Sequence, residues 1–338
     1  MSHLCFPYLR AGSRASTVCA NVLFVLGLGA AAVTACQATE AEPGHELRFT
    51  GPLVSSAPPL PKGYWIVEPY LIQTHVTGRY DADGHYQGTP TLRDDWQVAV
   101  PIIYGVTDRL TLGLGLNAVQ ARQQRGGWHW ATSDTSVTAS WLLAQGSGAH
   151  TPVATLMLRQ NLPTGEHDLL EQAGLLGATG SGAYSTTVGV YGQAHFLPAR
   201  NLRGRVNLTW RIAGADVDVD GRSAYGTAVG FHGDARLGGA LQASGSLEYS
   251  FNPRWVLAAD LVYEKEHGAR LRGTTPGANG SRQGIDHQLA SSWRLSAAPA
   301  VEYNWSARGG VILGVLVSLR GRNSAAIVSP QVAVNLLF

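Results

Sequence analysis

Charged residues, and lysine in particular, are scarce in this chain of 338 residues. Asp, Glu, Lys and Arg together make up 14% of the sequence, the formal net charge is +2, and Lys62 and Lys265 are the only lysines. A basic field that would attract nucleic acid is therefore absent, and we expect no nucleic-acid partner.

Cysteine and long apolar runs are confined to the N-terminal part of the sequence. The three cysteines are Cys5, Cys19 and Cys36, so residues 37–338 can form neither a disulfide framework nor a thiolate metal site. The one conspicuous apolar run, Val22 to Ala35, is shorter than the roughly 20 residues of a typical membrane-spanning helix.

The first 36 residues have the features of a secretory signal peptide. Basic Arg10 and Arg14 precede the apolar run, and small residues follow it. The end of this segment, Val33-Thr-Ala-Cys36, resembles a lipobox, in which Cys36 would be lipidated and become the mature N-terminus. Ordinary cleavage near Ala35 or Ala38, with Cys36 incidental, is an equal alternative.

A segment rich in Pro, Ala, Ser and Glu follows, over residues 37–62. Its five prolines predict an extended linker. A plug that folds into the domain that follows it, residues 63–338, is the less favoured alternative.

Strict alternation of apolar and small or polar residues fills the remainder of the chain. Leu110, Leu112, Leu114 and Leu116 alternate with Thr111, Gly113, Gly115 and Asn117. Side chains alternate between faces in a strand, so each segment has one apolar face. The segments are 64–73, 96–104, 110–118, 135–143, 153–162, 187–196, 205–212, 241–251, 255–264, 293–305, 311–320 and 332–338. Most are near the ~9–11 residues that cross a bilayer as a tilted strand.

The C-terminal strand carries the same pattern to its last residue. Leu336, Val334 and Val332 alternate back from Phe338. Terminal residues usually fray, so a strand that ends in this way needs a partner, and a closed barrel supplies one. The segment also resembles the C-terminal signature of bacterial outer-membrane proteins, and we expect the barrel-assembly machinery to engage it.

Connection lengths predict the topology. Long and short connections alternate, with a short last loop as the exception. The long set is 78–94, 120–133, 163–184, 213–240, 265–290 and the short 321–325; the turns are 105–109, 145–151, 197–204, 252–254 and 306–309. Short periplasmic turns and long outer loops are typical of transmembrane barrels. The sequence therefore predicts an all-β fold: a closed antiparallel transmembrane β-barrel of about 12 strands.

Three of the short turns share one sequence pattern: Tyr, a bulky apolar residue two positions later, Thr, Asn or Ser directly after it, and Arg two positions after that. The three examples are Tyr104 to Arg109, Tyr249 to Arg254 and Tyr303 to Arg308. Thr, Asn and Ser can bond their own backbone in a turn, and Tyr and Trp suit a membrane–water interface. Ordinary hairpin turns carrying a solubilising charge are the alternative.

The segments YGVTDRLTLGLGL, LRQNLPTGE and PAVEYNWSARGGVILGVLVSL resemble the outer-membrane family named for a putative meta-pathway of phenol degradation. The resemblance spans roughly residues 64–338. It implies a transporter-like barrel with a link to the uptake of aromatic compounds, and it implies no catalytic or binding residues.

Function in such a barrel depends on the residues that face its lumen. The charged members of the inward set are Glu68, Arg159, Arg205, Arg211, Glu248, Asp260, Glu264, Arg294, Glu302 and Arg320. These residues predict either a polar conduit or a salt-bridge network that fills the barrel. Small inward residues such as Gly113 and Ser244 favour the conduit slightly.

We therefore expect a passive channel in the bacterial outer membrane for small, aromatic or hydrophobic solutes. Its surroundings would be the lipid bilayer and lipopolysaccharide. A non-conducting barrel that binds a partner through its loops is the alternative. A lipid-modifying enzyme is less favoured, because no His-x-Ser pair places both residues on one strand face. We expect no catalytic residue, no metal and no cofactor.

Overall fold

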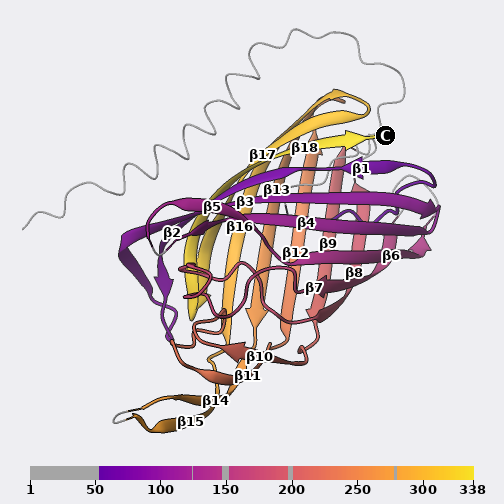
Figure 1. The fold of residues 1–338 in the computed structure, drawn as a ribbon. Helices are drawn as coiled ribbons and strands as arrows, with labels where there is room; N and C mark the ends of the chain where they lie inside the picture. Colours follow the sequence, from indigo (N-terminus) through magenta and orange to yellow (C-terminus); the bar gives the residue numbers. More distant parts are fainter. Residues whose placement is uncertain (1–52, 124, 147–151, 197–200, 278–279) are drawn as a thin grey trace, which may run out of the picture. The chain divides into compact units, whose positions relative to one another are not determined.

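The structure is a computed structural model that describes residues 53–123, 125–146, 152–196, 201–277 and 280–338. All of them belong to the unit Glu42–Phe338, the larger of two units in the chain. Among these residues, twelve antiparallel strands close into a barrel (Figure 1), which confirms the predicted fold class and strand number. The predicted signal peptide, Cys36 and residues 37–52 lie outside the described residues.

Strands that are neighbours along the chain are also neighbours in the barrel, and the last strand pairs with the first. The barrel strands are β2 (Tyr70–Tyr80), β3 (Tyr86–Thr107), β4 (Leu110–Arg122), β6 (Thr135–Gln145), β7 (Val153–Leu162), β8 (Ser185–Phe196), β9 (Leu202–Arg211), β12 (Ala240–Ser250), β13 (Trp255–Glu266), β16 (Ser292–Ser306), β17 (Gly309–Arg322) and β18 (Ser324–Leu337). Nowhere in the described ranges does a helix reach the length and hydropathy needed to cross a bilayer.

The predicted first strand, Tyr64 to Gln73, is in fact two strands. A short strand, β1 (Trp65–Val67), pairs with both β3 and β18, and β2 begins only at Tyr70. The break falls at Glu68–Pro69, where proline has no N–H to donate to a ladder. Beyond it, β2 pairs with β18 and closes the barrel, with Leu71 opposite Val332.

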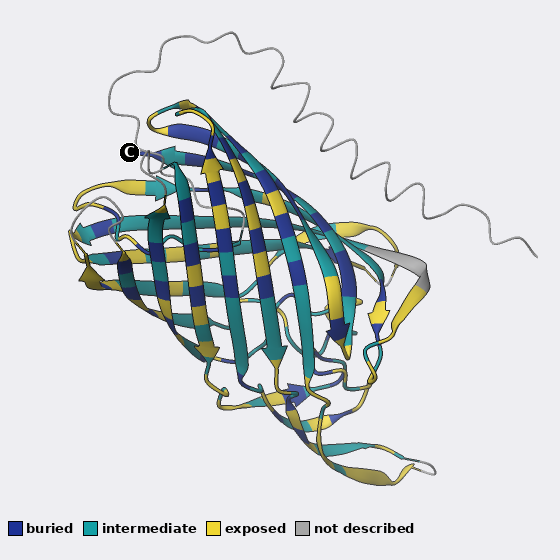
Figure 2. Cartoon of the chain, turned by 180° about the vertical axis from the view of Figure 1, so that it is seen from behind, coloured by how far each residue is buried: buried dark blue, intermediate teal, exposed yellow. Residues whose placement is uncertain are grey.

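The outer face of the barrel is apolar, and the inner face is mostly polar or small, with apolar exceptions such as Met157 and Ile312. On β9, Val206 and Leu208 are 63% and 54% exposed, whereas Asn207 between them is 7% exposed. The same alternation bands the strands in Figure 2. Leu112 is also exposed, and the run Asn335 to Leu337 is buried on alternate residues. A continuous belt of exposed leucine and valine suits contact with lipid, because such a patch in water would promote aggregation.

The turns that join β3 to β4, β12 to β13 and β16 to β17 lie at one end of the barrel, which we call the turn end. Thr107 Oγ1 accepts the backbone N–H of Leu110 at 2.9 Å, and Asn252 Oδ1 accepts that of Arg254 at 2.9 Å. Ser306 Oγ accepts the N–H of Arg308 at 3.2 Å. At these turns the Thr, Asn and Ser side chains therefore bond the backbone, as their shared sequence pattern predicts.

The opposite end, which we call the loop end, contains more regular structure than predicted. The predicted loop 78–94 is a tight hairpin in which β2 and β3 stay paired up to Tyr80 and Tyr86. β5 (Trp128–Thr132) extends the sheet beside β4. The predicted loops 213–240 and 265–290 contain a four-stranded sheet of β10 (Asp216–Asp220), β11 (His232–Arg236), β14 (Arg270–Pro276) and β15 (Arg282–Gln288). These strands are short and charged, so their alternation was weak in the sequence.

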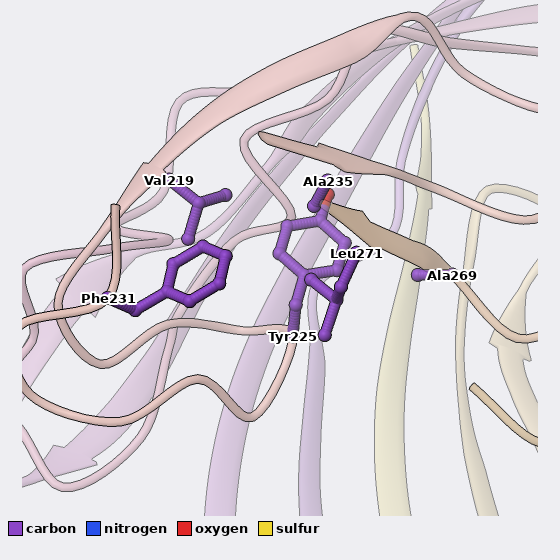
Figure 3. Packing of buried hydrophobic residues seen from close by; sticks show 6 residues of the cluster. All are labelled: Val219, Tyr225, Phe231, Ala235, Ala269 and Leu271. Atoms are coloured by element: carbon purple, nitrogen blue, oxygen red, sulfur yellow. The ribbon is translucent and has the colours of Figure 1, made fainter. Parts of the chain in front are cut away.

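An apolar cluster supports this four-stranded sheet. Figure 3 shows Val219 beside Phe231, and Tyr225 beside Leu271 and Ala235. Exposed ion pairs cross the sheet; among them, Arg236 donates to Asp216 at 2.7 and 2.8 Å, and Arg270 donates to Asp286 at 3.0 and 3.2 Å.

The four-stranded sheet should loosen in acid. Hydrogen bonds from Arg236 and Arg270 hold the pKa of Asp216 and of Asp286 below their ordinary value. A carboxylate with a lowered pKa stabilises the fold above its unfolded pKa, about 3.9, and that contribution is lost as pH falls further. Hydrogen-exchange protection factors of β10 and β14 should therefore drop below about pH 4. Protection that is constant down to pH 2, or that falls equally in β12, would contradict this expectation.

A charge on the outer face should destabilise the barrel. Val206 lies near the middle of β9, and arginine at the membrane midplane costs about 2–4 kcal/mol. The Val206→Arg variant should therefore unfold at lower urea concentration in phospholipid vesicles. Gln283→Arg, on the exposed strand β15, is the control and should change the unfolding free energy by less than about 0.5 kcal/mol. Equal losses in both variants would contradict the assigned outer face.

Candidate functional site in the barrel lumen

A buried ionic cluster occupies the turn-end half of the lumen. It is built around Glu248, which forms ion pairs with both Arg203 and Arg205. The two arginines alternate with Gly204 on β9, and Arg203 is the register partner of Glu248 on β12, so all three share the inner face. The Arg205 side chain is fully buried and Glu248 is 2% exposed. Buried charges need partners of this kind, because an isolated one would shed its charge or destabilise the fold.

Three further acids lie in the same half of the lumen. Glu302 is fully buried, and Arg203 and Arg205 both act on it electrostatically. Glu68 is hydrogen-bonded to Tyr70. Asp260, on β13, accepts backbone N–H groups from Leu53 at 2.9 Å and from Val54 at 3.2 Å.

The contacts of Asp260 are part of a longer run of contacts inside the barrel, made by residues 53–60, which we call the lumen segment. Within it, Ser56 Oγ donates to Gln193 Oε1 at 3.1 Å. The carbonyls of Ser55 and Ala57 accept from Asn207, at 3.2 Å, and from Thr155, respectively. The N–H of Leu60 donates to Thr111 Oγ1 at 2.9 Å. Its partners come from several strands, so this described part of the predicted linker or plug is bonded to the inner wall of the barrel.

Several apolar residues of the lumen segment are also buried. Val54 is fully buried and Ala57 is 1% exposed. Ala57 packs with Met157 and Tyr191, which project inward from β7 and β8. The inner wall of the barrel therefore covers the side chains of Val54 and Ala57.

Two cavities lie on the loop-end side of the lumen segment. The larger, which we call the vestibule, has a volume of about 850 Å³ and is lined by loop residues such as Leu176, Tyr225 and Leu289. The smaller, which we call the chamber, has a volume of about 330 Å³ and lies inside the barrel. Arg211 and Glu266 line both cavities, and Arg211 donates to Glu266 at 3.3 Å. Leu53 and Ser55 of the lumen segment line the chamber.

The structure separates the ten predicted lumen residues into three groups. The ionic cluster and the acids beside it contain Glu68, Arg205, Glu248, Asp260 and Glu302. The second group lies at the chamber, which is lined by Arg159, Arg211 and Glu264. Arg294 belongs to this group because it donates to Glu264 at 2.7 Å.

Arg320 is the member that the structure sets apart from the others. It is exposed and pairs with Leu295, beyond a register shift between Leu295 and Ser296. Cross-strand partners share a face, and the shift moves Arg320 off the face that carries Arg294. Simple alternation from Val311 could not reveal this irregularity.

Arg203 was missed by sequence reasoning, and the individual contacts of the lumen segment could not be predicted. Arg203 lies two residues before Arg205, so it shares that face, but the predicted strand began at Arg205. Strand β9 begins at Leu202, and extending the alternation by one pair would have included Arg203. The lumen segment has no periodic signal, because its contacts are with residues far away in the sequence.

Comparison with known proteins gives likenesses in fold only. No family model matches the chain, and no curated protein matches it. Among solved structures, the COG4313 outer-membrane channel from Pseudomonas putida F1 is 15% identical with a TM-score of 0.61, over 88% of this chain and 100% of that chain. The NanC porin is 8% identical with a TM-score of 0.43, over 80% and 98% of the two chains. The Pseudomonas putida toluene transporter TodX is 14% identical with a TM-score of 0.36, over 82% and 91%. Of these three, the first alone has a TM-score above 0.5, and at 15% identity it supports the barrel fold and no more.

Removing the shared acid of the ionic cluster should destabilise the protein strongly. In the Glu248→Gln variant, the fully buried Arg205 loses its paired carboxylate, and breaking a buried pair in this way costs about 3–5 kcal/mol. Urea unfolding followed by tryptophan fluorescence measures the loss. The matched control is Glu266→Gln, whose carboxylate is 56% exposed, and it should cost less than about 1 kcal/mol. Similar losses in the two variants would show that the cluster is not a buried ionic network.

Proposed function

We propose that this chain is a channel of the bacterial outer membrane that passes small solutes by passive diffusion. In this proposal the turn end faces the periplasm and the loop end faces the outside, as in barrels with short periplasmic turns. The observation that carries the proposal is the pair of cavities that share Arg211 and Glu266 and lead from the loops into the barrel interior. An apolar outer belt around a mostly polar interior supports it.

The proposed class of solute rests on the sequence resemblance and not on the cavities. The resemblance of three segments to the meta-pathway phenol degradation family favours aromatic or hydrophobic solutes. The chain's structural likeness to the COG4313 channel is consistent with a channel role but names no solute. We assign no catalysis, no metal and no cofactor to the lumen.

The expected export of the chain and its assembly into the membrane belong to the same proposal. Residues 1–36 would direct export, with lipidation at Cys36 or cleavage beside it. The β18 strand and Phe338 would engage the barrel-assembly machinery. Phospholipid and lipopolysaccharide would surround the outer belt.

One observation favours a non-conducting barrel instead. The lumen segment and the ionic cluster together occupy the turn-end half of the interior, and the segment is bonded to strands β4, β7, β8, β9 and β13. We propose that the lumen segment restricts the channel and that its displacement opens it. A segment that never leaves would make the barrel structural or partner-binding.

Planar-bilayer conductance tests this proposal. The wild-type protein should show current steps, and a variant lacking residues 53–60 should show larger ones, because the lumen segment then no longer obstructs the interior. Silence of both proteins, each verified as folded by heat-modifiable migration on gels, would contradict a channel and support the non-conducting barrel.

A tether tests the role of the lumen segment separately. The side chains of Ser56 and Gln193 lie 3.1 Å apart, Oγ to Oε1, so cysteines placed there can be joined by a short bis-thiosulfonate reagent. Joining the segment to β8 should reduce conductance, and reduction should restore it. Each single-cysteine variant is the control. Conductance unchanged by the tether would show that solutes pass the segment without displacing it.

A further inference from the structure

The chamber contains a cation that no described acid neutralises. Arg159 projects from β7 into the chamber, and its Nε donates to Thr138 Oγ1 at 3.3 Å. No carboxylate among the described residues lies within ion-pair distance of Arg159. A guanidinium of this kind has further N–H groups in a planar fork, which matches the geometry of a carboxylate.

The acids that line the chamber are already engaged. Glu264 accepts from Arg294 at 2.7 Å, and Glu266 accepts from Arg211 at 3.3 Å. Arg211 also has a buried Nε with no hydrogen-bond partner among the described residues. The inward charges of Arg159, Arg211 and Arg294 therefore exceed those of Glu264 and Glu266, and the excess is centred on Arg159.

A few apolar groups contribute to the chamber's mainly polar lining. Met157 and Tyr191 border it, although only 1% and 6% of their surface is exposed, and Leu53 of the lumen segment also lines it. Met157 lies two residues before Arg159 on β7, so both point inward from the same strand. A ligand held at Arg159 would thus lie beside a thioether and a phenol ring. Such a surface suits a planar apolar body, because both groups pack well against aromatic rings.

We propose that the chamber binds small aromatic carboxylates, with the carboxylate on the guanidinium of Arg159 and the ring against Met157 and Tyr191. Its volume of about 330 Å³ lies at the small end of the range for ligand pockets, about 300–1,000 Å³. This inference rests on the proposed channel for its biological meaning, because a solute would reach the chamber through the vestibule. It narrows the solute class from aromatic compounds in general to aromatic anions.

Equilibrium binding tests the chamber without requiring conduction. Benzoate, measured by isothermal titration calorimetry on the detergent-solubilised full chain at pH 7, should bind, whereas uncharged benzamide should bind far more weakly. Arg159→Gln should weaken benzoate by about tenfold or more, since a hydrogen bond to a charged group is lost. Arg159→Lys should weaken it less, because the charge remains while the planar fork is lost.

The matched control is Arg320→Gln, which removes the same charge from an arginine outside the chamber. It should leave benzoate affinity within about twofold, because salt screens an exposed charge at a distance. Equal weakening in Arg159→Gln and Arg320→Gln, or equal binding of benzoate and benzamide, would overturn the proposal. If Arg159→Gln fails to fold, the comparison of benzoate with benzamide on the wild type and the Arg159→Lys variant still decides it.

Bilayer recordings separate this inference from the proposed function. A wild-type channel that conducts but binds no benzoate would refute the chamber and leave the channel standing. Arg159-dependent benzoate binding by a barrel that never conducts would refute the channel and leave the chamber standing. With both correct, the reversal potential in a KCl gradient should show a preference for chloride that Arg159→Gln diminishes.

Discussion

Closure of the strand ladder between β18 and β2 is the constraint on which the rest of the structure depends. Within a bilayer no water satisfies exposed N–H and C=O groups, so a sheet can cross only if it has no free edge. β18 meets this demand on both sides, because it pairs with β17 along one edge and with β2 and β1 along the other. Once the sheet is closed, each strand residue has only two environments, the lipid outside and the enclosed interior.

The size of that interior explains its contents. Eight strands leave a lumen that side chains fill, and sixteen leave an aqueous channel. The strand number here falls between, so side chains alone do not fill the space. The ionic cluster and the lumen segment occupy the turn-end half, and the chamber and the vestibule remain in the loop-end half. In the proposed channel, solute specificity would be set in the chamber, between Arg211 and Leu53.

Charges in the lumen belong to two classes that composition alone cannot distinguish. Arg205 is fully buried against Glu248, so its charge is balanced within the protein and stabilises the barrel. Arg159 is partly accessible, lines a cavity, and has a threonine hydroxyl as its described hydrogen-bond partner. The charge of Arg205 is balanced and needs no ligand, whereas the charge of Arg159 is available to a ligand. The difference depends on which acid stands opposite each arginine, and that depends on strand register.

The sequence by itself determined the fold class, the strand positions and the inward face of most strands. Period-two alternation is a local property, so runs such as Leu110 to Leu116 specify a two-faced strand without reference to any partner. Only the tertiary structure, through closure of the barrel, decided which residues meet inside it. The register shift at Leu295 set Arg320 apart, and pairing across β9 and β12 brought Arg203 to Glu248. The lumen segment took its place through bonds to Asp260 and Thr111, which lie far away along the chain. Such contacts leave no periodic trace in the sequence, because their geometry exists only when the barrel is closed.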